Sequence, residues 1–374
     1  MAKLSYAQLK TLVASIVTTA KLSNDTFSVT RDNIVGLMDK VGKITTIDTV
    51  YTLDKLSMFD GEYLSFGKTI EEYQQDLIIV EDYDSTGANA LSPHDPTYRP
   101  VFYSYTVGKK KIPTTIRNNN IERAVHFEEQ FVSIVAMQTK RLEDSMAQYR
   151  YSVKREMIAK LIDIASTEMS STTTFVASTA YSVNALLRDN DTPTAYGIVV
   201  KAYSANDASN WADAVAKGFI IVLNLVQSIS APVDTTTGEA FIKQVKEDVE
   251  KANDSSEGNS LNGNSLGATP EDSLYLIVKQ GVIPTLEVDT LAGAFNEQKL
   301  AIPAKVVVVK DFGSDTSGAY AVLLDGRGMR LHNTYNATRE NANGDGDFLN
   351  IFRHTEDTAY ISRNTFLKVY KQPA

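Results

Sequence analysis

The feature that most constrains this fold is the segment from Arg123 to Ser166, which contains neither proline nor glycine. Apolar side chains recur in it every three or four residues, as they do along one face of an α-helix. They include Phe127, Phe131, Ile134, Leu142, Met146, Tyr149, Val153, Met157, Leu161 and Ile164. At about 1.5 Å per residue, one helix over this segment spans on the order of 60 Å, more than the width of a small domain.

The spacing is not a strict seven-residue repeat, so a coiled coil is the weaker interpretation of this helix. Its other faces carry charged side chains, which are typical of a solvated or bridging surface. They are Glu128, Glu129, Lys140, Arg141, Glu143, Asp144, Lys154, Arg155 and Glu156. We therefore expect a long surface helix that packs along one stripe on a sheet.

Two β-favouring segments precede the helix and predict a two-stranded arm. Gln75 to Tyr83 contains the run Leu77-Ile78-Ile79-Val80, and Arg99 to Val107 alternates between two faces. Asp84 to Tyr98, between them, contains Gly, Asn, Pro and Asp residues that favour turns. An isolated hairpin is at best marginally stable in water, so such an arm is expected to bury against something else, for instance another subunit.

Two short helices are predicted ahead of the arm, from Leu9 to Val17 and from Asp32 to Val41. Their apolar stripes fit a pair of core helices, and they also fit an N-terminal arm that docks on a neighbouring molecule. The sequence leaves both interpretations open.

The region after the long helix mixes strand and helix patterns, which indicates an α/β or α+β unit between about residues 179 and 330. Strands are predicted at Tyr196–Tyr203, Leu274–Val278 and Val306–Lys310, and helices at Asp207–Ser230, Gly238–Ala252 and Pro284–Phe295. Asn253 to Thr269 is rich in Asn, Ser and Gly and predicts a flexible surface loop.

The C-terminal part is predicted to be rich in strands. They are expected at Tyr320–Leu324, Met329–Thr338, Phe348–His354, Thr358–Ser362 and Thr365–Tyr370, with a tight turn at Asp325–Gly328 and a loop at Asn341–Asp347. That loop resembles a calcium-binding loop in its alternating oxygen ligands, but its twelfth position is Phe352 instead of a bidentate Glu. The pattern favours a hairpin loop over an ion site.

Composition and motifs exclude several kinds of chemistry. The chain has no Cys, which rules out disulfides, thiolate metal sites and a Cys nucleophile. Asp325–Gly328 lacks the Lys-Ser/Thr of a phosphate-binding loop, and no Gly-x-Ser-x-Gly motif occurs. No two of His94, His126, His332 and His354 stand four residues apart. We expect no catalytic, metal or cofactor site.

Charge and hydropathy bear on the expected partners. With 37 Lys and Arg against 46 Asp and Glu, the net charge of -9 argues against a protein that wraps nucleic acid. No long uninterrupted apolar run occurs, so no membrane span is expected. The one basic cluster, Lys109-Lys110-Lys111, is interpreted as a solvated turn at the base of the arm, with a contact to an acidic neighbour as the alternative.

The order of these segments resembles the major capsid proteins of tailed bacteriophages, which share the HK97-like fold. In that family an N-terminal arm precedes an extended β-hairpin, the E-loop, and a long spine helix then crosses the P-domain before an A-domain. Here Phe66 to Glu72 opens the arm in a similar manner. Arg327–Arg330, Arg339–Asn341 and Lys368–Tyr370 resemble the strands that return to the P-domain.

The resemblance implies an α+β subunit with four parts. They are an N-terminal arm (1–58), an E-loop hairpin (59–115), a P-domain with the spine helix (116–178 and 331–374) and a mixed α/β A-domain (179–330). Candidate contacts between subunits are Tyr83, His94, Arg99, Tyr103, Lys109, Lys110 and Lys111.

The function implied is structural and not enzymatic. Such subunits assemble as hexamers and pentamers into an icosahedral head that encloses double-stranded DNA without sequence-specific binding. A scaffolding protein and a portal are the implied partners, and the capsid is assembled in the bacterial cytoplasm. Two alternatives stay open: a soluble α/β enzyme with an unrecognised carboxylate or hydroxyl site, and an encapsulin-like non-viral shell protein.

Overall fold

A computed structural model describes residues 54–65, 67, 69–75, 83, 98–103, 105–117, 128–168, 173–192, 195–255, 257–263, 267–282, 302–346 and 348–373. The short helices predicted before residue 42 and the helix predicted at Pro284–Phe295 lie outside these residues, as do His94 and His126. The chain divides into two units. The described residues of the smaller unit come from 113–144 and 339–352, and the larger unit comprises 54–112, 145–338 and 353–374.

The long helix is α4, which runs from Glu128 to Asp163 and continues as a π-helical turn, Ile164–Glu168. The predicted helix is confirmed over these residues. Its C-terminal half buries an apolar face at Met157, Ile158, Leu161, Ile162 and Ala165. The expectation that Lys154 lies on a solvated face is wrong, because its side chain is completely buried. Lys154 precedes Ile158 by four residues and Leu161 by seven, so helical periodicity places all three on the same face.

The core of the larger unit is a five-stranded mixed sheet in the order β10-β9-β11-β14-β8. Its strands are β8 (Val226–Ser228), β9 (Leu274–Lys279), β10 (Lys305–Val309), β11 (Ala319–Asp325) and β14 (Leu367–Lys371). β9 pairs parallel with β10 and antiparallel with β11, and β14 pairs antiparallel with β11 and parallel with β8. The strands predicted at Leu274–Val278, Val306–Lys310, Tyr320–Leu324 and Thr365–Tyr370 are confirmed.

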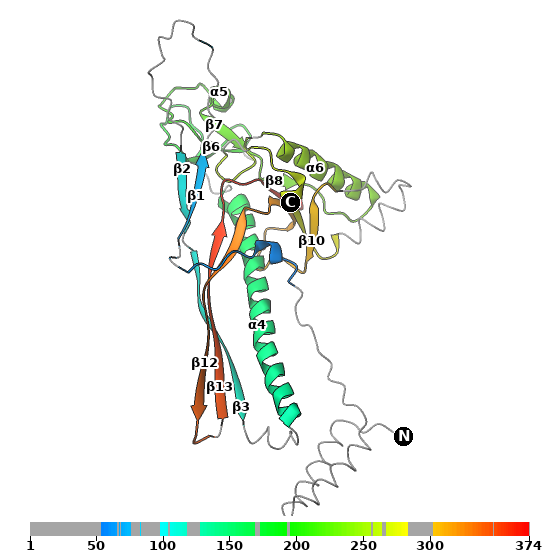
Figure 1. Cartoon of the computed structure of the whole chain (residues 1–374). Helices are drawn as coiled ribbons and strands as arrows, with labels where there is room; N and C mark the ends of the chain where they lie inside the picture. The colour runs from blue at the N-terminus through cyan, green and yellow to red at the C-terminus, as the bar shows by residue number, and fades with distance from the viewer. Residues whose placement is uncertain are drawn as a thin grey trace, which may run out of the picture. The chain divides into compact units, whose positions relative to one another are not determined.

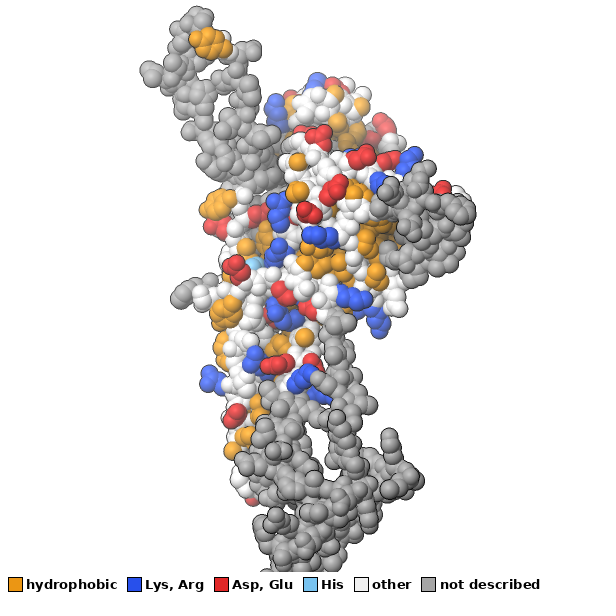
Figure 2. Space-filling model, turned by 45° about the vertical axis from the view of Figure 1, so that its right-hand side comes forward, with side chains coloured by type: hydrophobic (Ala, Val, Ile, Leu, Met, Phe, Trp, Pro, Cys, Tyr) orange, Lys and Arg blue, Asp and Glu red, His pale blue; other side chains and the backbone are white. Residues whose placement is uncertain are grey.

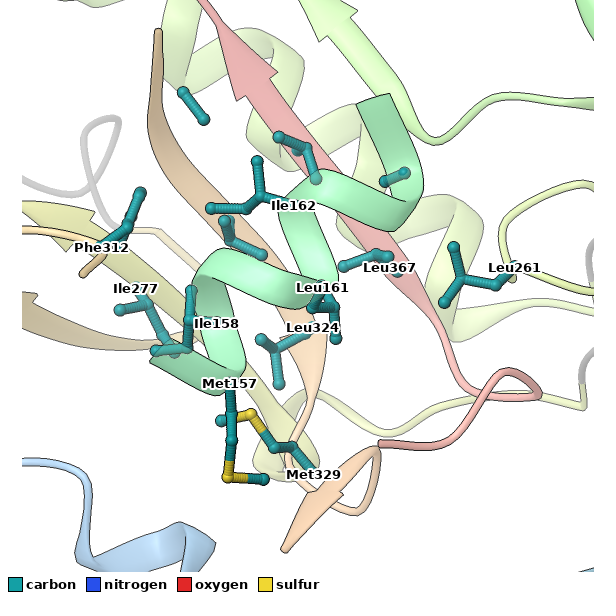
Figure 3. Close-up of a cluster of buried hydrophobic side chains, with 14 of the residues drawn as sticks. Met157, Ile158, Leu161, Ile162, Leu261, Ile277, Phe312, Leu324, Met329 and Leu367 are labelled. Carbon is teal, nitrogen blue, oxygen red and sulfur yellow. The ribbon is translucent and has the colours of Figure 1, made fainter. Parts of the chain in front are cut away.

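Two helices cover the two faces of this sheet (Figure 1). Alternate residues of β9 and β11 point to opposite sides, and Ile277, Val322 and Leu324 pack with the buried face of α4. Figure 3 shows Ile158, Leu161 and Ile162 of α4 beside Ile277, Leu324 and Leu367. Leu276, Val278, Ala321 and Leu323 pack instead with Phe241, Val245 and Val249 of α6 (Thr235–Asn253), which confirms the helix predicted at Gly238–Ala252. Burial on both faces explains why these strands are continuously apolar.

A four-stranded sheet with its own aromatic core forms another part of the larger unit. Its strands, in the order β4-β5-β6-β7, are Thr173–Thr174, Leu186–Arg188, Tyr196–Val199 and Ile220–Leu223. Phe175, Tyr203 and Trp211 are buried together, and the rings of Phe175 and Trp211 meet edge to face with centroids 5.8 Å apart. The strand predicted at Tyr196–Tyr203 is confirmed in its first half only.

The helix predicted at Asp207–Ser230 is wrong over most of its length. The helix α5 covers only Trp211–Ala216, capped by the Asn210 side chain, and the chain then forms β7 and β8. Gly218 adopts φ = 70°, a left-handed conformation that ends helices. The following Ile220-Ile221-Val222 run is β-branched and pairs with β6. A short apolar run of this kind fits both the helical and the strand period, and Gly218 favours the strand because it ends the helix before the run.

The loop predicted to lie on the surface at Asn253–Thr269 is wrong in its middle part, where residues 258–261 and Gly263 are buried. Gly258 (φ = 73°) and Gly263 (φ = 66°) allow the loop to pass close to the four-stranded sheet. A Cβ on Gly258 would lie 2.0 Å from the carbonyl oxygen of Val222. The glycines therefore permit close packing here and do not mark a solvated linker.

Three long strands form a further sheet in the order β12-β13-β3. They are β3 (Tyr105–Arg117), β12 (Met329–Asn343) and β13 (Phe348–Ile361). The strands predicted separately at Phe348–His354 and Thr358–Ser362 are thus one strand, and β12 continues beyond Thr338. The connection between β12 and β13 is the turn at residues 344–346, where Gly346 donates its N–H to Asn343 Oδ1 (2.9 Å). The predicted turn at Asp325–Gly328 is confirmed by the Gly328 N–H bond to the Asp325 carbonyl (2.9 Å).

Two single helical turns complete the described elements, Ser57–Phe59 (η1) and Glu271–Ser273 (η3). In the part of the chain that the structure describes, no helix combines the length and the apolar character needed to cross a membrane.

Candidate functional site

A separate two-stranded sheet, which we name the β1–β2 arm, lies within the residues of the predicted arm. β1 (Ile70–Gln75) and β2 (Tyr98–Tyr103) pair antiparallel, with Ile70 opposite Tyr103 and Gln75 opposite Tyr98. No other described strand pairs with either of them. The first strand begins earlier than the predicted Gln75–Tyr83, most of which lies outside the described residues. The strand predicted at Arg99–Val107 is wrong as one element, because β2 and β3 belong to different sheets.

Exposed tyrosines are concentrated around this arm. Tyr63, Tyr73, Tyr83 and Tyr105 expose 59%, 68%, 92% and 68% of their surface, and every other tyrosine whose burial the structure describes is less exposed. The phenol of Tyr73 lies beside Glu71, whose hydrogen bond and negative charge raise its pKa. An amphipathic ring with a polar hydroxyl is a side chain that protein interfaces favour.

One carboxylate at the start of the arm connects it to the rest of the larger unit. Glu72 on β1 accepts hydrogen bonds from the Tyr360 hydroxyl (2.7 Å), the Ser362 hydroxyl (2.8 Å) and the Asn364 amide (3.3 Å). Ser362 and Asn364 are buried, and Tyr360 is half-buried. The three donors lie at the end of β13 and in the turn that follows it.

An ionic junction around the buried Lys154 holds the segment that leads into the arm. The Lys154 ammonium lies 2.7 Å from Asp54 and 2.8 Å from Asp60, and Arg150 lies 3.3 Å from Asp60 and 3.6 Å from Asp357. Buried charges are tolerated where opposite charges and hydrogen bonds compensate for lost hydration. The junction therefore holds the segment that begins at Asp54 against α4.

Backbone pairing continues this attachment toward the arm. Gly61 donates its N–H to the Leu331 carbonyl (3.0 Å) and Leu64 to that of Asn333 (2.9 Å). His332 Nδ1 lies 2.9 Å from the carbonyl oxygen of Glu62. The chain thus follows β12 from Asp60 to Leu64 before it enters β1.

The sequence-predicted contact residues fall into four groups. Tyr83 is highly exposed, Arg99 and Tyr103 lie on β2, and His94 is outside the described residues. Lys109, Lys110 and Lys111 are exposed, but their interpretation as a turn is wrong because they lie within β3. Lys109 places its ammonium 4.0 Å from the centre of the Tyr335 ring, a cation–π contact.

An open groove beside α4 has a volume of about 1020 Å³. Its lining includes Tyr105 and Val107 of β3, Tyr149, Val153 and Glu156 of α4, and the loop 314–317. Glu156 accepts hydrogen bonds from the Ser314 hydroxyl (2.7 Å) and the Ser314 N–H (3.3 Å). No histidine lines this groove, so the residues described there offer no imidazole base for a serine nucleophile.

Other polar clusters serve the core. Asp248 of α6 is buried with Lys368 and Tyr370 of β14, and the Tyr370 hydroxyl donates to Asp248 (3.0 Å). Lys368 also donates to the Asn224 carbonyl, and burial lowers its pKa to about 8. Burial and the charge of Asp248 raise the pKa of Tyr370. Within the described residues, no three His, Asp or Glu side chains gather as metal ligands.

Charges on the face drawn in Figure 2 are mixed. Lys and Arg side chains alternate there with Asp and Glu and do not gather into one basic surface. Such a face provides no continuous track for a phosphate backbone.

Sequence reasoning missed Glu72 and the Lys154 junction. Each is a single charged residue whose partners are distant in sequence, since Tyr360 lies 288 residues from Glu72 and Asp54 lies 100 residues from Lys154. The available signal for Lys154 was its position on the apolar face of α4. No comparable signal distinguishes Glu72 from Glu71.

Comparison with solved structures defines the class of fold. The chain is similar to a chain in the structure of the head fibre and inner core protein gp22 of native bacteriophage P68, with 11% identity, a TM-score of 0.55 and coverage of 88% of this chain and 87% of that chain. It is also similar to a chain in the capsid structure of Staphylococcus phage Andhra, with 11% identity, a TM-score of 0.53 and coverage of 89% and 90%. The fold is a mixed helix-and-sheet fold of the phage capsid class.

The family follows from the sequence itself. The model of the Phi29-like phage major capsid protein family matches residues 7–365. This chain belongs to that family, and its role is a structural one in a phage capsid. No curated protein matches the chain.

Proposed function

We propose that copies of this chain assemble as hexamers and pentamers into an icosahedral head that encloses double-stranded DNA. The observation that carries the proposal is the β1–β2 arm, a two-stranded sheet that shares no strand with the other described sheets and carries the exposed Tyr73. A two-stranded sheet is marginal in water on its own. Burial against the next subunit supplies the stability that it lacks.

The geometry of such contacts favours closed rings. An arm that reaches from one subunit to a different surface of the next makes a head-to-tail contact, which closes into a ring if the rotation is right. Rings of five and six copies are the units of an icosahedral shell. Membership of the capsid family supports this form of assembly.

Within this proposal, the parts of the chain correspond to those of the HK97-like fold. The hairpin within 59–115 is the E-loop, α4 is the spine helix of a P-domain formed by 116–178 and 331–374, and 179–330 is the A-domain. Residues 1–58 form the N-terminal arm. The exposure of Tyr83 and of Lys109–Lys111 supports their assignment as contacts between subunits, together with His94, Arg99 and Tyr103.

The partners follow from the same proposal. A scaffolding protein directs assembly, a portal occupies one vertex, and both act in the cytoplasm of the bacterial host. The net charge of -9 suits a wall that encloses DNA without binding its sequence.

The test is assembly of the purified protein, alone and co-expressed with the phage's scaffolding protein. Sedimentation velocity and negative-stain imaging are expected to show closed shells or rings of five and six copies. A compact monomer at high concentration, in all salts and with the scaffolding protein supplied, would contradict the proposal.

A further inference from the structure

Among the side chains of β1 that the structure describes, Glu72 makes three hydrogen bonds to residues outside the arm. It is half-buried, and its neighbours Glu71 and Tyr73 on β1 are exposed. Both of its carboxylate oxygens are used: Oε2 accepts from Tyr360, and Oε1 accepts from Ser362 and Asn364. One side chain thus joins β1 to the end of β13 and the following turn.

The directions of these hydrogen bonds are fixed by their surroundings. The Ser362 hydroxyl oxygen accepts the N–H of Asn364 (3.0 Å), so its proton is free to point at Glu72. The Asn364 side-chain oxygen Oδ1 accepts from the side-chain amide of Asn262 (2.7 Å), which turns the Asn364 side-chain nitrogen toward Glu72. Two donors are therefore pre-oriented toward one carboxylate oxygen, Oε1.

The donors are held in place by backbone hydrogen bonds to neighbouring segments. Ser362 donates its N–H to the Gly328 carbonyl (2.8 Å), and Asn262 donates its N–H to the Arg363 carbonyl (3.1 Å). Asn262 belongs to the loop in which Gly258 and Gly263 pack closely on the four-stranded sheet. The hydrogen bonds of Glu72 thus connect a two-stranded arm of marginal stability to the packed interior of the larger unit.

We propose that Glu72 is a positioning residue that holds the β1–β2 arm against the corner after β13, the turn that contains Ser362 and Asn364. This contact, the Glu72 latch, sets the direction in which the arm meets a neighbouring copy. The role of this latch in assembly rests on the proposed function. Its effect on the arm within one subunit is independent of that role.

The test compares full-length Glu72→Gln with Glu239→Gln, which removes the same charge from an exposed position on α6. Gln keeps the size of Glu but removes the charge and replaces one acceptor oxygen with an amide nitrogen. The Tyr360 hydroxyl then has no acceptor to donate to at that position, and the bonds from Ser362 and Asn364 lose their charge assistance. Hydrogen exchange is measured at the amides of 70–75 and 98–103, with those of β9 and β11 as internal references. Wild-type and variant assembly are measured in parallel.

For Glu72→Gln we expect exchange in the arm to be about tenfold faster or more, as fits the loss of a hydrogen bond to a charged group. We expect unchanged exchange in β9 and β11 and fewer closed shells, whereas Glu239→Gln behaves like wild type. Unchanged exchange in the arm would overturn the latch. An equal rise in β9 and β11 would also overturn it, because Glu72 would then support the whole fold.

Two further measurements separate the parts of the proposal. Tyr360→Phe removes one donor, and combined with Glu72→Gln it should accelerate exchange less than the product of the two single effects, since both variants lose the same bond. If the exchange rate of the double variant equals the full product of the two single effects, the two variants do not act on the same Tyr360–Glu72 hydrogen bond. If the wild-type protein forms no shells, the proposed function is contradicted. Hydrogen exchange in the arm still shows whether Glu72 holds it in place. If the arm is loosened but shells form at the wild-type yield, the link to assembly is overturned.

Discussion

The ammonium of Lys154, fully buried on α4, lies between the carboxylates of Asp54 and Asp60 at 2.7 and 2.8 Å. Asp54 and Asp60 flank the helical turn η1, whose Phe59 is itself buried in the main core. A charge at the centre of an apolar helix face is therefore the attachment point for the segment that leads into the arm. Four consequences of this structure can be measured.

The first concerns Lys154. Lys154→Met retains an apolar stem but leaves the Asp54 carboxylate without its cation and Asp60 with Arg150 alone, so the free energy of unfolding should fall by about 2–3 kcal/mol. The control is Lys160→Met on the same helix, where the pair with Asp163 is exposed and a change of about 0.5 kcal/mol or less is expected. Urea denaturation checks both. Equal effects would show that the junction carries no special stability.

The second concerns the buried loop. A Cβ on Gly258 would meet the Val222 carbonyl oxygen at 2.0 Å, and the residue has φ = 73°, so Gly258→Ala should cost on the order of 3 kcal/mol. Gly267 lies in the same connection, and a Cβ added there would meet nothing within 4 Å. Gly267→Ala should therefore leave the thermal unfolding temperature nearly unchanged. A tolerated alanine at Gly258 would refute the close packing of this loop.

The third concerns pH. Burial holds the pKa of Lys368 at about 8 in the folded chain, below its ordinary value of 10.5. Between these values the unfolded chain binds more protons, so stability should rise with pH in this window. Above about pH 10 the raised pKa of Tyr370 acts in the opposite direction, because only the unfolded tyrosine then ionises.

The measurement is urea denaturation at about pH 7.5 and pH 9.5, where wild type should gain about 1–2 kcal/mol relative to Lys368→Met. The comparison with this variant cancels the titration of other groups. The same pH slope in both proteins would mean that Lys368 stays charged throughout.

The fourth concerns the exposed tyrosines. Tyr73 exposes 68% of its surface on the arm, and Val233 exposes 69% away from it, just before α6. Neither Tyr73→Ser nor Val233→Ser should change subunit stability by more than about 0.5 kcal/mol. Tyr73→Ser alone should reduce the yield of closed shells, as quantified by sedimentation. If Tyr73→Ser assembles normally, the Tyr73 side chain is not part of the contact between subunits.

The sequence predicted those elements whose periodicity is long and unambiguous. The helix α4 and the strands β9, β11 and β14 follow from apolar patterns that tertiary packing reinforces. The segment 207–230 was predicted wrongly as one helix because its apolar residues Trp211, Val215, Phe219 and Val222 fit a helical stripe. Gly218 and the β-branched run after it favour a turn and a strand instead.

Burial of polar residues was harder to predict than the position of elements. The loop at 258–263 has the composition of a linker, yet its glycines serve close packing. Lys154 and Glu72 derive their roles from partners that only the folded chain brings near. Periodicity gives information about the face of an element, and it gives none about which distant residue that face meets.

The central claim is that the β1–β2 arm of one copy is buried against another. A high-resolution cryo-electron microscopy reconstruction of assembled particles tests it most directly. The account predicts closed shells in which Tyr73 and β1–β2 lie against a neighbouring copy, with Glu72 still bonded to the corner after β13. Shells in which the arm projects into solvent on every copy would contradict the account.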